Sequence, residues 1–292
     1  MLPAELDVTV YADIHTDLAG LSVADLEQHY RTIGIKQGRR SNSIADRNAF
    51  AALANRSGDV LEIGPLDNPM LRGPNISYAD YFSFEELKKK ATTHGRSAET
   101  VPNIDYVLGE MTLSDIPKKF VAVLSSHCIE HQTDLIRHLQ DVQKLLNDEG
   151  RYFALIPDKR YCFDAFKSET TIGEIIDAHE NRMTVHPLSK VIAHFASMSH
   201  NRHVDHWDQP VTSVPPIETA KIRKAINTWR ESEGRYLDVH GIYFTPDSFR
   251  EIMRLLRELG YIDLHIERLY PTRFRKNEFW AVLQSSNPNR AG

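Results

Sequence analysis

Residues 59–69 constrain the fold of this chain more than any other stretch. An apolar run from Val60 to Ile63 ends at Gly64 and leads into a turn with two prolines, an aspartate and an asparagine. A buried parallel strand delivers its backbone to a ligand in this way at its carboxyl end. Gly64 has no Cβ, so a ligand can approach the main chain there, and Glu62 adds a carboxylate to the same crevice. The pattern is also typical of an ordinary buried strand that binds nothing.

Strand and helix patterns alternate along the rest of the chain. Apolar runs predict further strands at 76–81, 105–109, 120–126 and 151–157. Helical spacing predicts helices at 83–94 and 133–146, the second one ended by Glu149 and Gly150. A helix at 247–259 and two strands, expected to be an antiparallel pair, follow at 261–270 and 278–284. This alternation predicts an α/β protein with a Rossmann-like parallel sheet and right-handed crossovers.

The same pattern divides the chain into three parts. Residues 57–157 and 241–285 form the Rossmann-like domain, and residues 1–56 form a helical extension, irregular over 1–20 and helical over 22–30 and 43–55. Residues 158–240 are an insertion rich in His, Arg and Asp, with helices expected near 171–181, 187–199 and 216–233. An insertion at the carboxyl edge of a sheet covers the crevice where ligands bind, which makes it a candidate substrate lid. The tail from Ser285 is expected to be disordered.

Charge and cysteine content exclude several classes of protein. The net charge of -5 argues against a nucleic-acid-binding surface, and no apolar run reaches the roughly 18 residues of a membrane span. The N-terminus lacks a signal peptide. Cys128 and Cys162 fit a reducing compartment, and we expect both to be inert. We therefore predict a cytoplasmic protein, and the sequence leaves a homodimer open.

Polar residues follow four successive strands at their carboxyl ends: Glu62 with Gly64, Asp80, Glu110, and Ser126 with His127. Residues 125–131 read Ser-Ser-His-Cys-Ile-Glu-His, and residues 146–152 read Leu-Asn-Asp-Glu-Gly-Arg-Tyr one helix later. In this order the chain resembles the class I S-adenosylmethionine-dependent methyltransferases, in particular the subgroup called methyltransferase type 11. The resemblance covers residues 59–157 and, less closely, 245–284. It implies a seven-stranded sheet with a reversed last strand, and S-adenosylmethionine as cofactor with S-adenosylhomocysteine as product.

The resemblance also implies which residues hold that cofactor. Asp80 would accept hydrogen bonds from the ribose hydroxyls, and Glu110 would lie near the adenine amino group. The remaining cofactor residues would be Glu62, Gly64, Pro65, Asn68, Tyr81, Met111, Ser126 and His127. Two alternatives stay open: Asp80 as a helix-capping carboxylate, and Glu110 as a solvated loop charge.

The chain departs from the family's glycine-rich loop. Of three glycines spaced by two, only Gly64 is present, and Leu66 and Asn68 occupy the other two positions. Asparagine can adopt a left-handed backbone, so Asn68 is the expected substitute, whereas Leu66 cannot approach a ligand as glycine does. A non-catalytic module with a degenerate cofactor fold therefore stays open.

Methyl transfer to a hydroxyl group requires a residue that accepts the proton. His127 is the first candidate because it ends the fourth strand, and His131 is the second, with helix packing or capping as its alternative. His203 and His240 are candidates from the insertion and from the rim of the crevice. Histidines 200, 203 and 206 are three residues apart, a spacing that on a helix offers a metal cluster. We favour solvated lid histidines over a metal.

Two segments of the chain indicate the chemical class of the methyl acceptor. Residues 158–164 follow the fifth strand, and their charges and aromatic rings suit a sugar or a phosphorylated glycan. The alternative is salt-bridged loop packing. Residues 29–39 resemble a short segment of bacterial polysaccharide-building proteins, with a simple packing element as the alternative. We predict O-methylation of a sugar, glycan or other small polar acceptor; an amine or natural-product acceptor is the runner-up. The predicted substrate-binding residues are Asp158, Arg160, Tyr161, His200 and His206.

Overall fold

The computed structural model of the protein describes residues 1–55, 57–211 and 213–285. The strands are β1 (Val60–Ile63), β2 (Ile76–Asp80), β3 (Tyr106–Val107), β4 (Phe120–Ser126), β5 (Leu146–Pro157), β6 (Leu264–Tyr270) and β7 (Glu278–Ser285). The α-helices are α1 (Val8–Ile14), α2 (Val23–His29), α3 (Arg47–Ala52), α4 (Phe84–Thr93), α5 (Leu135–Leu145), α6 (Ile172–Glu180), α7 (Leu188–Ala196), α8 (His203–Asp208), α9 (Thr219–Glu231) and α10 (Pro246–Glu258).

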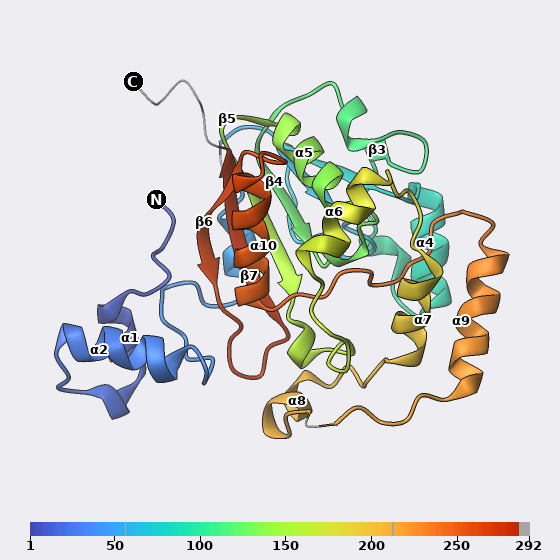
Figure 1. The fold of residues 1–292 in the computed structure, drawn as a ribbon. Helices are drawn as coiled ribbons and strands as arrows, with labels where there is room; N and C mark the ends of the chain where they lie inside the picture. Colours follow the sequence, from blue (N-terminus) through green and yellow to red (C-terminus); the bar gives the residue numbers. More distant parts are fainter. Residues whose placement is uncertain (56, 212, 286–292) are drawn as a thin grey trace.

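The seven strands form one sheet in the order β3-β2-β1-β4-β5-β7-β6. The strands β1 to β5 pair in parallel, and β7 runs antiparallel to both β5 and β6. The predicted α/β class is therefore confirmed. The strand order and the reversed strand are the arrangement that the methyltransferase resemblance implies (Figure 1).

Helices cover both faces of the sheet, because neighbouring strand residues point to opposite faces. Val123 of β4 belongs to the apolar cluster that α5, α6 and α10 close, and Figure 1 shows these three helices over one face. Its neighbours Ala122 and Leu124 belong to a second cluster with Phe50 of α3. A strand buried on both faces needs a nearly continuous apolar sequence, which is why residues 120–126 were recognisable.

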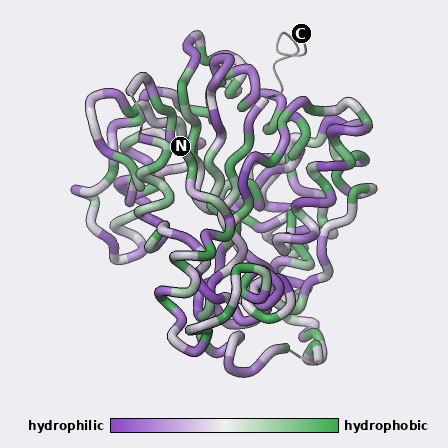
Figure 2. Tube along the Cα trace, turned by 90° about the vertical axis from the view of Figure 1, so that its left-hand side faces the viewer, coloured by the Kyte–Doolittle hydropathy of each residue, from purple (hydrophilic) through white to green (hydrophobic). Residues whose placement is uncertain are grey.

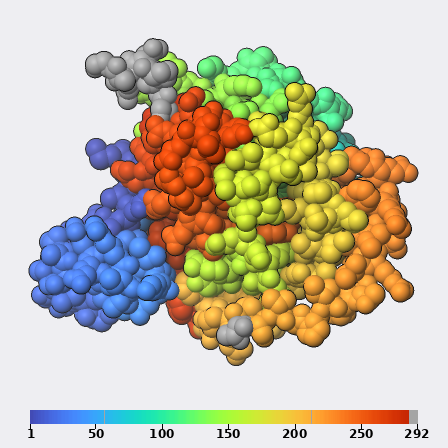
Figure 3. Space-filling model, in the orientation of Figure 1, coloured from blue at the N-terminus to red at the C-terminus, as the bar shows by residue number. Residues whose placement is uncertain are grey.

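The N-terminal extension has a small core of its own, made by Tyr11, Leu18, Leu26 and Tyr30. The expectation of an irregular arm over residues 1–20 is wrong, because α1 spans Val8–Ile14. The side chain of Asp7 caps this helix by accepting the Thr9 and Val10 N–H groups, and the buried Tyr11 ring anchors it. Figure 3 shows the extension as a separate lobe on one side of the molecule.

The insertion contains helices where the sequence predicted them, in α6, α7 and α9, and the additional short helix α8. Val191 of α7 packs with Ala225 of α9, which gives this part its own apolar contact. Figure 1 shows α7 and α9 on the side opposite the extension. The role of the insertion as a substrate lid stays a prediction.

Several element boundaries differ from those expected. The fifth strand begins at Leu146 rather than at 151, because Leu146 already pairs with Phe120 and the register then shifts by a bulge around Glu149 and Gly150. The third strand keeps only two residues, and α3 begins at Arg47, where Asp46 caps it. The tail predicted to be disordered begins at Ser285, which is instead the last residue of β7, and the rest of that tail, 286–292, lies outside the described residues.

Hydrophobic and hydrophilic residues alternate along most of the chain (Figure 2). Among the described residues, no helix is both long enough and apolar enough to cross a bilayer.

Candidate functional site

The loop after β1 is held by the carboxylate of Glu62. Its two oxygens accept the N–H groups of Met70 and Leu71 at 2.8 and 2.9 Å. Burial raises the pKa of Glu62 to about 7, although these two N–H groups favour the ionised form. Gly64 turns the chain at the strand end with a φ of +70°. Glu62 therefore fixes the loop, and Gly64 supplies the left-handed turn that begins it.

Leu66, rather than Asn68, takes the second left-handed position in this loop. Its φ is +49°, and Asn68 is not among the described residues with positive φ, so the expected substitution by Asn68 is wrong. The Leu66 N–H donates to Oδ2 of Asp80 at 3.2 Å, which holds the strained backbone in place. The Leu66 side chain is 43% exposed and points away from the core.

A cavity of about 710 Å³ opens between this loop and the end of β4. That volume is in the usual range for small-molecule sites. Arg47 reaches into it and donates to the Ser126 hydroxyl at 2.7 Å. The predicted residues Glu62, Gly64, Pro65, Asn68, Ser126 and His127 all line the cavity, with Arg47, Asn48, Leu66, Asp67, Pro69, Met70 and Arg96.

Asp80 and Tyr81 lie at the end of β2 but outside this lining. The buried Asp80 carboxylate accepts the Phe82 N–H at 3.0 Å in addition to that of Leu66, and burial raises its pKa. Tyr81 stacks against Tyr236 of the insertion, with ring centroids 4.4 Å apart. Asp80 thus holds two backbone N–H groups outside any helix, and the alternative of a helix-capping carboxylate is wrong, because Ser83 is the N-cap of α4.

Glu110 and Met111 follow β3 in a turn. Glu110 is exposed and its N–H donates to the Val107 carbonyl, while Met111 packs against the main core. The structure does not bring Glu110 into the cavity, in keeping with the solvated loop charge.

His127 ends β4 with a φ of +52°, an uncommon conformation for a residue other than glycine. Its Nε2 donates to Oε2 of Glu278 at 2.8 Å, and its Nδ1 lies 4.0 Å from Oε1 of Glu130. Burial opposes protonation of the ring, but the hydrogen bond to Glu278 and the charge of Glu130 outweigh it and raise the pKa of His127. The ring therefore stands between the cavity and a buried carboxylate.

His131 and His240 join His127 around Glu130. Their Nε2 atoms each lie 3.7 Å from Glu130 Oε1, and the two rings meet edge to face with centroids 4.6 Å apart. Three of the four predicted catalytic histidines thus converge on one carboxylate. The sequence reasoning missed Glu130 as a site residue, although it stands in the same motif, between His127 and His131.

His200, His203 and His206 lie apart from this group. The helix α8 begins at His203, so the assumed helical spacing does not include His200. The His200 ring instead stacks on that of His206 at 4.2 Å, and Nε2 of His206 donates to the His200 carbonyl. Histidines 200 and 206 therefore make a local packing contact.

Asp158, Arg160 and Tyr161 form a structural group beside the extension. The buried Asp158 accepts Nη2 of Arg160 and the Thr272 hydroxyl, both at 2.6 Å. Tyr161 stacks on Trp207, with centroids 3.9 Å apart. Arg160 and Tyr161 line a separate cavity of about 160 Å³, and the cavity at His127 is lined by other described residues.

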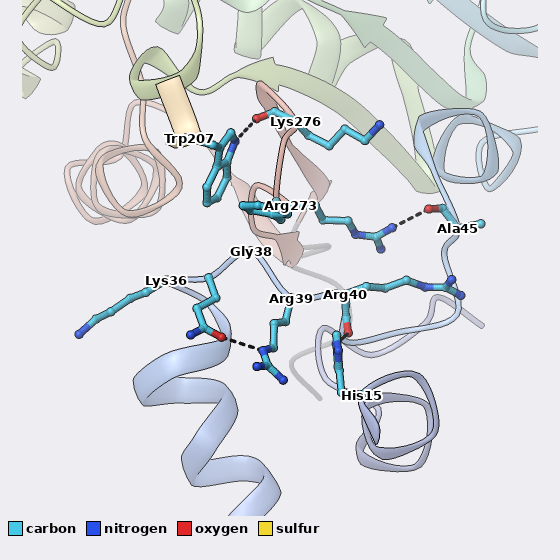
Figure 4. A pocket seen from close by; sticks show the side chains of 11 residues that line it. His15, Lys36, Gly38, Arg39, Arg40, Ala45, Trp207, Arg273 and Lys276 are labelled. Carbon is cyan, nitrogen blue, oxygen red and sulfur yellow. Dashed lines mark hydrogen bonds between the residues drawn. The ribbon is translucent and has the colours of Figure 1, made fainter. Parts of the chain in front are cut away.

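A further cavity of about 680 Å³ lies between the extension and the β6–β7 turn, and five of its eleven lining residues are lysine or arginine. Figure 4 shows Arg273 pointing to the Ala45 carbonyl, to which it donates at 2.8 Å. Arg39 is paired with Asp17. Among the described residues, the other lining cations have no carboxylate within 4.0 Å: Lys36, Arg40, Arg273 and Lys276.

The two cysteines are buried or half-buried thiols. Burial raises the pKa of both Cys128 and Cys162, so neither is a ready thiolate.

The residues present fit S-adenosylmethionine in part. The cations Arg47 and Arg96 on the cavity wall suit its carboxylate, and Gly64 leaves room, since a Cβ there would come no closer than 3.9 Å to Cys128. Each oxygen of Asp80 already holds one N–H group and keeps a second lone pair for a ribose hydroxyl.

No protein-family model matches the chain, and no curated protein does. The solved structures similar to it include the CcbJ methyltransferase from Streptomyces caelestis (11% identity, 82% of this chain and 93% of that chain, TM-score 0.38). They also include the DhpI complex with SAH (12% identity, 96% of this chain and 95% of that chain, TM-score 0.40). A third is a protein from Rhodobacter sphaeroides described among zinc-dependent alcohol dehydrogenases (17% identity, 89% of this chain and 97% of that chain, TM-score 0.45). Likenesses this distant carry no argument, so the fold rests on the strand order observed here.

Proposed function

We propose that the protein is an S-adenosylmethionine-dependent methyltransferase. One observation carries the proposal: in a sheet of this order, the left-handed turn at Gly64 and the end of β4 at His127 border the same cavity of about 710 Å³. The carboxyl edge of a parallel sheet, where the strand order reverses, is the usual ligand site of such folds.

Different residues of the site would bind different parts of the cofactor. Arg47 and Arg96 of the cavity wall attract the carboxylate end of the cofactor, and Gly64 admits it to the main chain. Asp80 lies outside the cavity lining, at the end of β2, and would receive the ribose hydroxyls there beside the Leu66 N–H that it already holds. When bound, S-adenosylmethionine supplies an electrophilic methyl group on its sulfonium. The protein contributes chiefly by holding the acceptor in line with that group and by excluding water.

An acceptor hydroxyl must lose its proton during transfer. His127 is the residue placed to receive it, because it lines the cavity and Glu278 fixes its ring through Nε2. Replacement of His127 by Gln should lower kcat by about 10²–10⁴-fold for a hydroxyl acceptor. An amine acceptor, the runner-up, would tolerate the same change.

We favour a phosphorylated sugar or glycan as the acceptor. Ala45 lines the cation-lined cavity of Figure 4, and Arg47, two residues further along the chain, lines the cofactor cavity. Lys276 also lines the first cavity, and Glu278, two residues further on, pairs with Arg47 at 3.3 Å. Lys36, Arg40 and Arg273 would hold the phosphate of such an acceptor.

The second candidate is a non-catalytic module that uses the fold to bind glycan-assembly proteins. The observation that favours it is that the Asp80 carboxylate already accepts two backbone N–H groups. The neighbouring Tyr81 ring is likewise stacked against Tyr236.

Calorimetric titration of S-adenosylhomocysteine separates the two candidates. The enzyme should bind it at micromolar concentration, and Asp80→Ala should weaken binding by about 1–3 kcal/mol. Asp115→Ala is the control, because the Asp115 carboxylate also accepts a backbone N–H, that of Thr112, whereas the Asp80 carboxylate accepts the N–H of Leu66, a residue of the cavity lining. No binding by the wild type would leave the non-catalytic module. If the wild type binds S-adenosylhomocysteine, transfer of a labelled methyl group to phosphorylated sugars would test the acceptor.

A further inference from the structure

Four side chains meet in the interior behind the cofactor cavity. Around Oε1 of Glu130 lie Nε2 of His131 at 3.7 Å, Nε2 of His240 at 3.7 Å and Nδ1 of His127 at 4.0 Å. One ligand atom each from Glu130, His131 and His240 can be chosen so that all lie within 4.8 Å of one another.

Glu130 is a buried carboxylate without a partner. It is 1% exposed, and neither oxygen has a hydrogen-bond partner among the described residues. Burying such a group unpaired is costly, and an unpaired buried carboxylate calls for a cation.

Neither His131 nor His240 donates a hydrogen bond to Glu130, although Nε2 of each ring lies 3.7 Å from it. Nδ1 of His240 donates to Oδ2 of Asp164 at 2.6 Å, and Nδ1 of His131 lies 3.3 Å from Oδ1 of Asp238. The proton on Nδ1 of His240 leaves a lone pair on its Nε2, 3.7 Å from Oε1 of Glu130. Nδ1 of His131 is buried and has no hydrogen-bond partner among the described residues, with the Asp238 carboxylate as its nearest acid. A histidine whose second nitrogen meets a carboxylate is the usual arrangement around a bound metal.

The backbone ties the two parts of this group together. The N–H groups of Gly241 and Ile242 both donate to the Glu130 carbonyl, at 2.8 and 3.2 Å. His240 therefore stays beside Glu130 although the two residues are far apart in the sequence.

The two separations between the histidine nitrogens and Glu130 are close to those of a metal site. A metal bound at about 2.1 Å in tetrahedral geometry keeps its ligand atoms about 3.4 Å apart. The observed separations of 3.7 Å from the two histidines to Glu130 need a contraction of only a few tenths of an ångström.

We propose that Glu130, His131 and His240 bind a divalent transition metal, with zinc as its representative. Two imidazoles and one carboxylate are a ligand set that such metals take, and three protein ligands leave a fourth position open. His127, whose Nδ1 lies 4.0 Å from Oε1 of Glu130, also lines the cofactor cavity and so lies between the two sites. The site stands on these contacts alone and does not depend on methyl transfer.

The test is calorimetric titration of ZnCl₂ into protein that has been freed of metal with a chelator. The wild type should bind one equivalent, and His131→Gln and His240→Gln should each weaken binding by at least about 100-fold. His179→Gln is the matched control, because His179 also pairs with a carboxylate, Asp134 at 3.0 Å, but belongs to no group of three possible ligands among the described residues. Asp238→Asn should weaken binding about 10-fold. Asp238 is 58% exposed, so this variant should fold even if a core variant does not.

Cobalt gives a second readout on the unaltered protein. Bound Co²⁺ should show visible absorption bands of a nitrogen and oxygen site without the intense near-ultraviolet band of a thiolate, which separates this site from Cys128. Absence of stoichiometric binding by the wild type, equal loss in His179→Gln, or a thiolate band would each overturn the proposal. Ion pairing of Glu130 with the surrounding histidines would then be the explanation of its burial.

Discussion

Tyr236 lies on Tyr81 with ring planes 25° apart and centroids 4.4 Å apart. Tyr81 directly follows Asp80, so a ring from the insertion is stacked beside the strand end that the resemblance assigns to the cofactor ribose. Asp238 of the same segment lies 3.6 Å from Lys90 of α4 and 3.3 Å from His131. These contacts hold the segment against the carboxyl edge of the sheet.

Replacement of Tyr236 by alanine should therefore tighten cofactor binding. Aromatic stacking contributes about 0.5–1.5 kcal/mol beyond burial, and a cofactor that must displace this contact loses that amount of affinity. We expect the variant to bind S-adenosylhomocysteine about 2–10-fold more tightly by calorimetry. Tyr236→Phe, which keeps the stacking ring, is the control. Weaker binding by the alanine variant would mean that the ring forms part of the cofactor site.

His138 should make the protein less stable in acid. Burial lowers the pKa of His138 to about 4 from its ordinary value of 6.5. Between these pH values the unfolded chain binds more protons than the folded protein, so stability falls as the pH drops from 6.5 to 4. The full effect is roughly 3 kcal/mol.

The variant His138→Gln tests this effect, because glutamine does not titrate and can still meet the Tyr152 hydroxyl, now 3.2 Å from Nε2 of His138. Urea unfolding at several pH values should show a shallower loss of stability in the variant. Parallel curves for the two proteins would contradict the assignment.

The cation-lined cavity should recognise phosphate through exposed lysines. Lys36 and Lys276 line it and have no carboxylate within 4.0 Å among the described residues. The double change to glutamine should raise KM for a phosphorylated acceptor about 10-fold and flatten its dependence on salt, because two attractive charges are lost. The exposed pair Lys221 and Lys224 of α9, changed in the same way, controls for net charge. An equal rise in KM in that control would place recognition elsewhere.

The fold was largely predictable because its strands are buried on both faces. Residues 120–126 and 278–284 are nearly all apolar, so their sequence alone indicates strands. The strand order was not contained in any local pattern and came from the resemblance. Boundaries set by tertiary contacts were missed, as at Leu146, where pairing with Phe120 extends the strand.

The site was predictable by residue type but not by arrangement. His127, His131 and His240 were candidates from their places at strand ends and turns, yet only the fold brings His240 beside Glu130. The regular spacing of histidines 200, 203 and 206 was misleading, because that signal presumes a helix through all three, and α8 begins at His203.

Leu66 offers a test of the strain in the loop after β1. A leucine held in the left-handed region destabilises the folded protein by about 1 kcal/mol, and a glycine there does not. Glycine instead costs a similar amount because it gives the unfolded chain more conformational freedom. Because the Leu66 side chain is 43% exposed, little burial is lost, and Leu66→Gly should unfold within about 0.5 kcal/mol of the wild type. The matched control is Leu259→Gly: Leu259 is 59% exposed but has a φ of −78°, so that change should destabilise the protein by about 1 kcal/mol. Equal losses in the two variants, measured by urea unfolding, would show that the positive φ of Leu66 stores no strain.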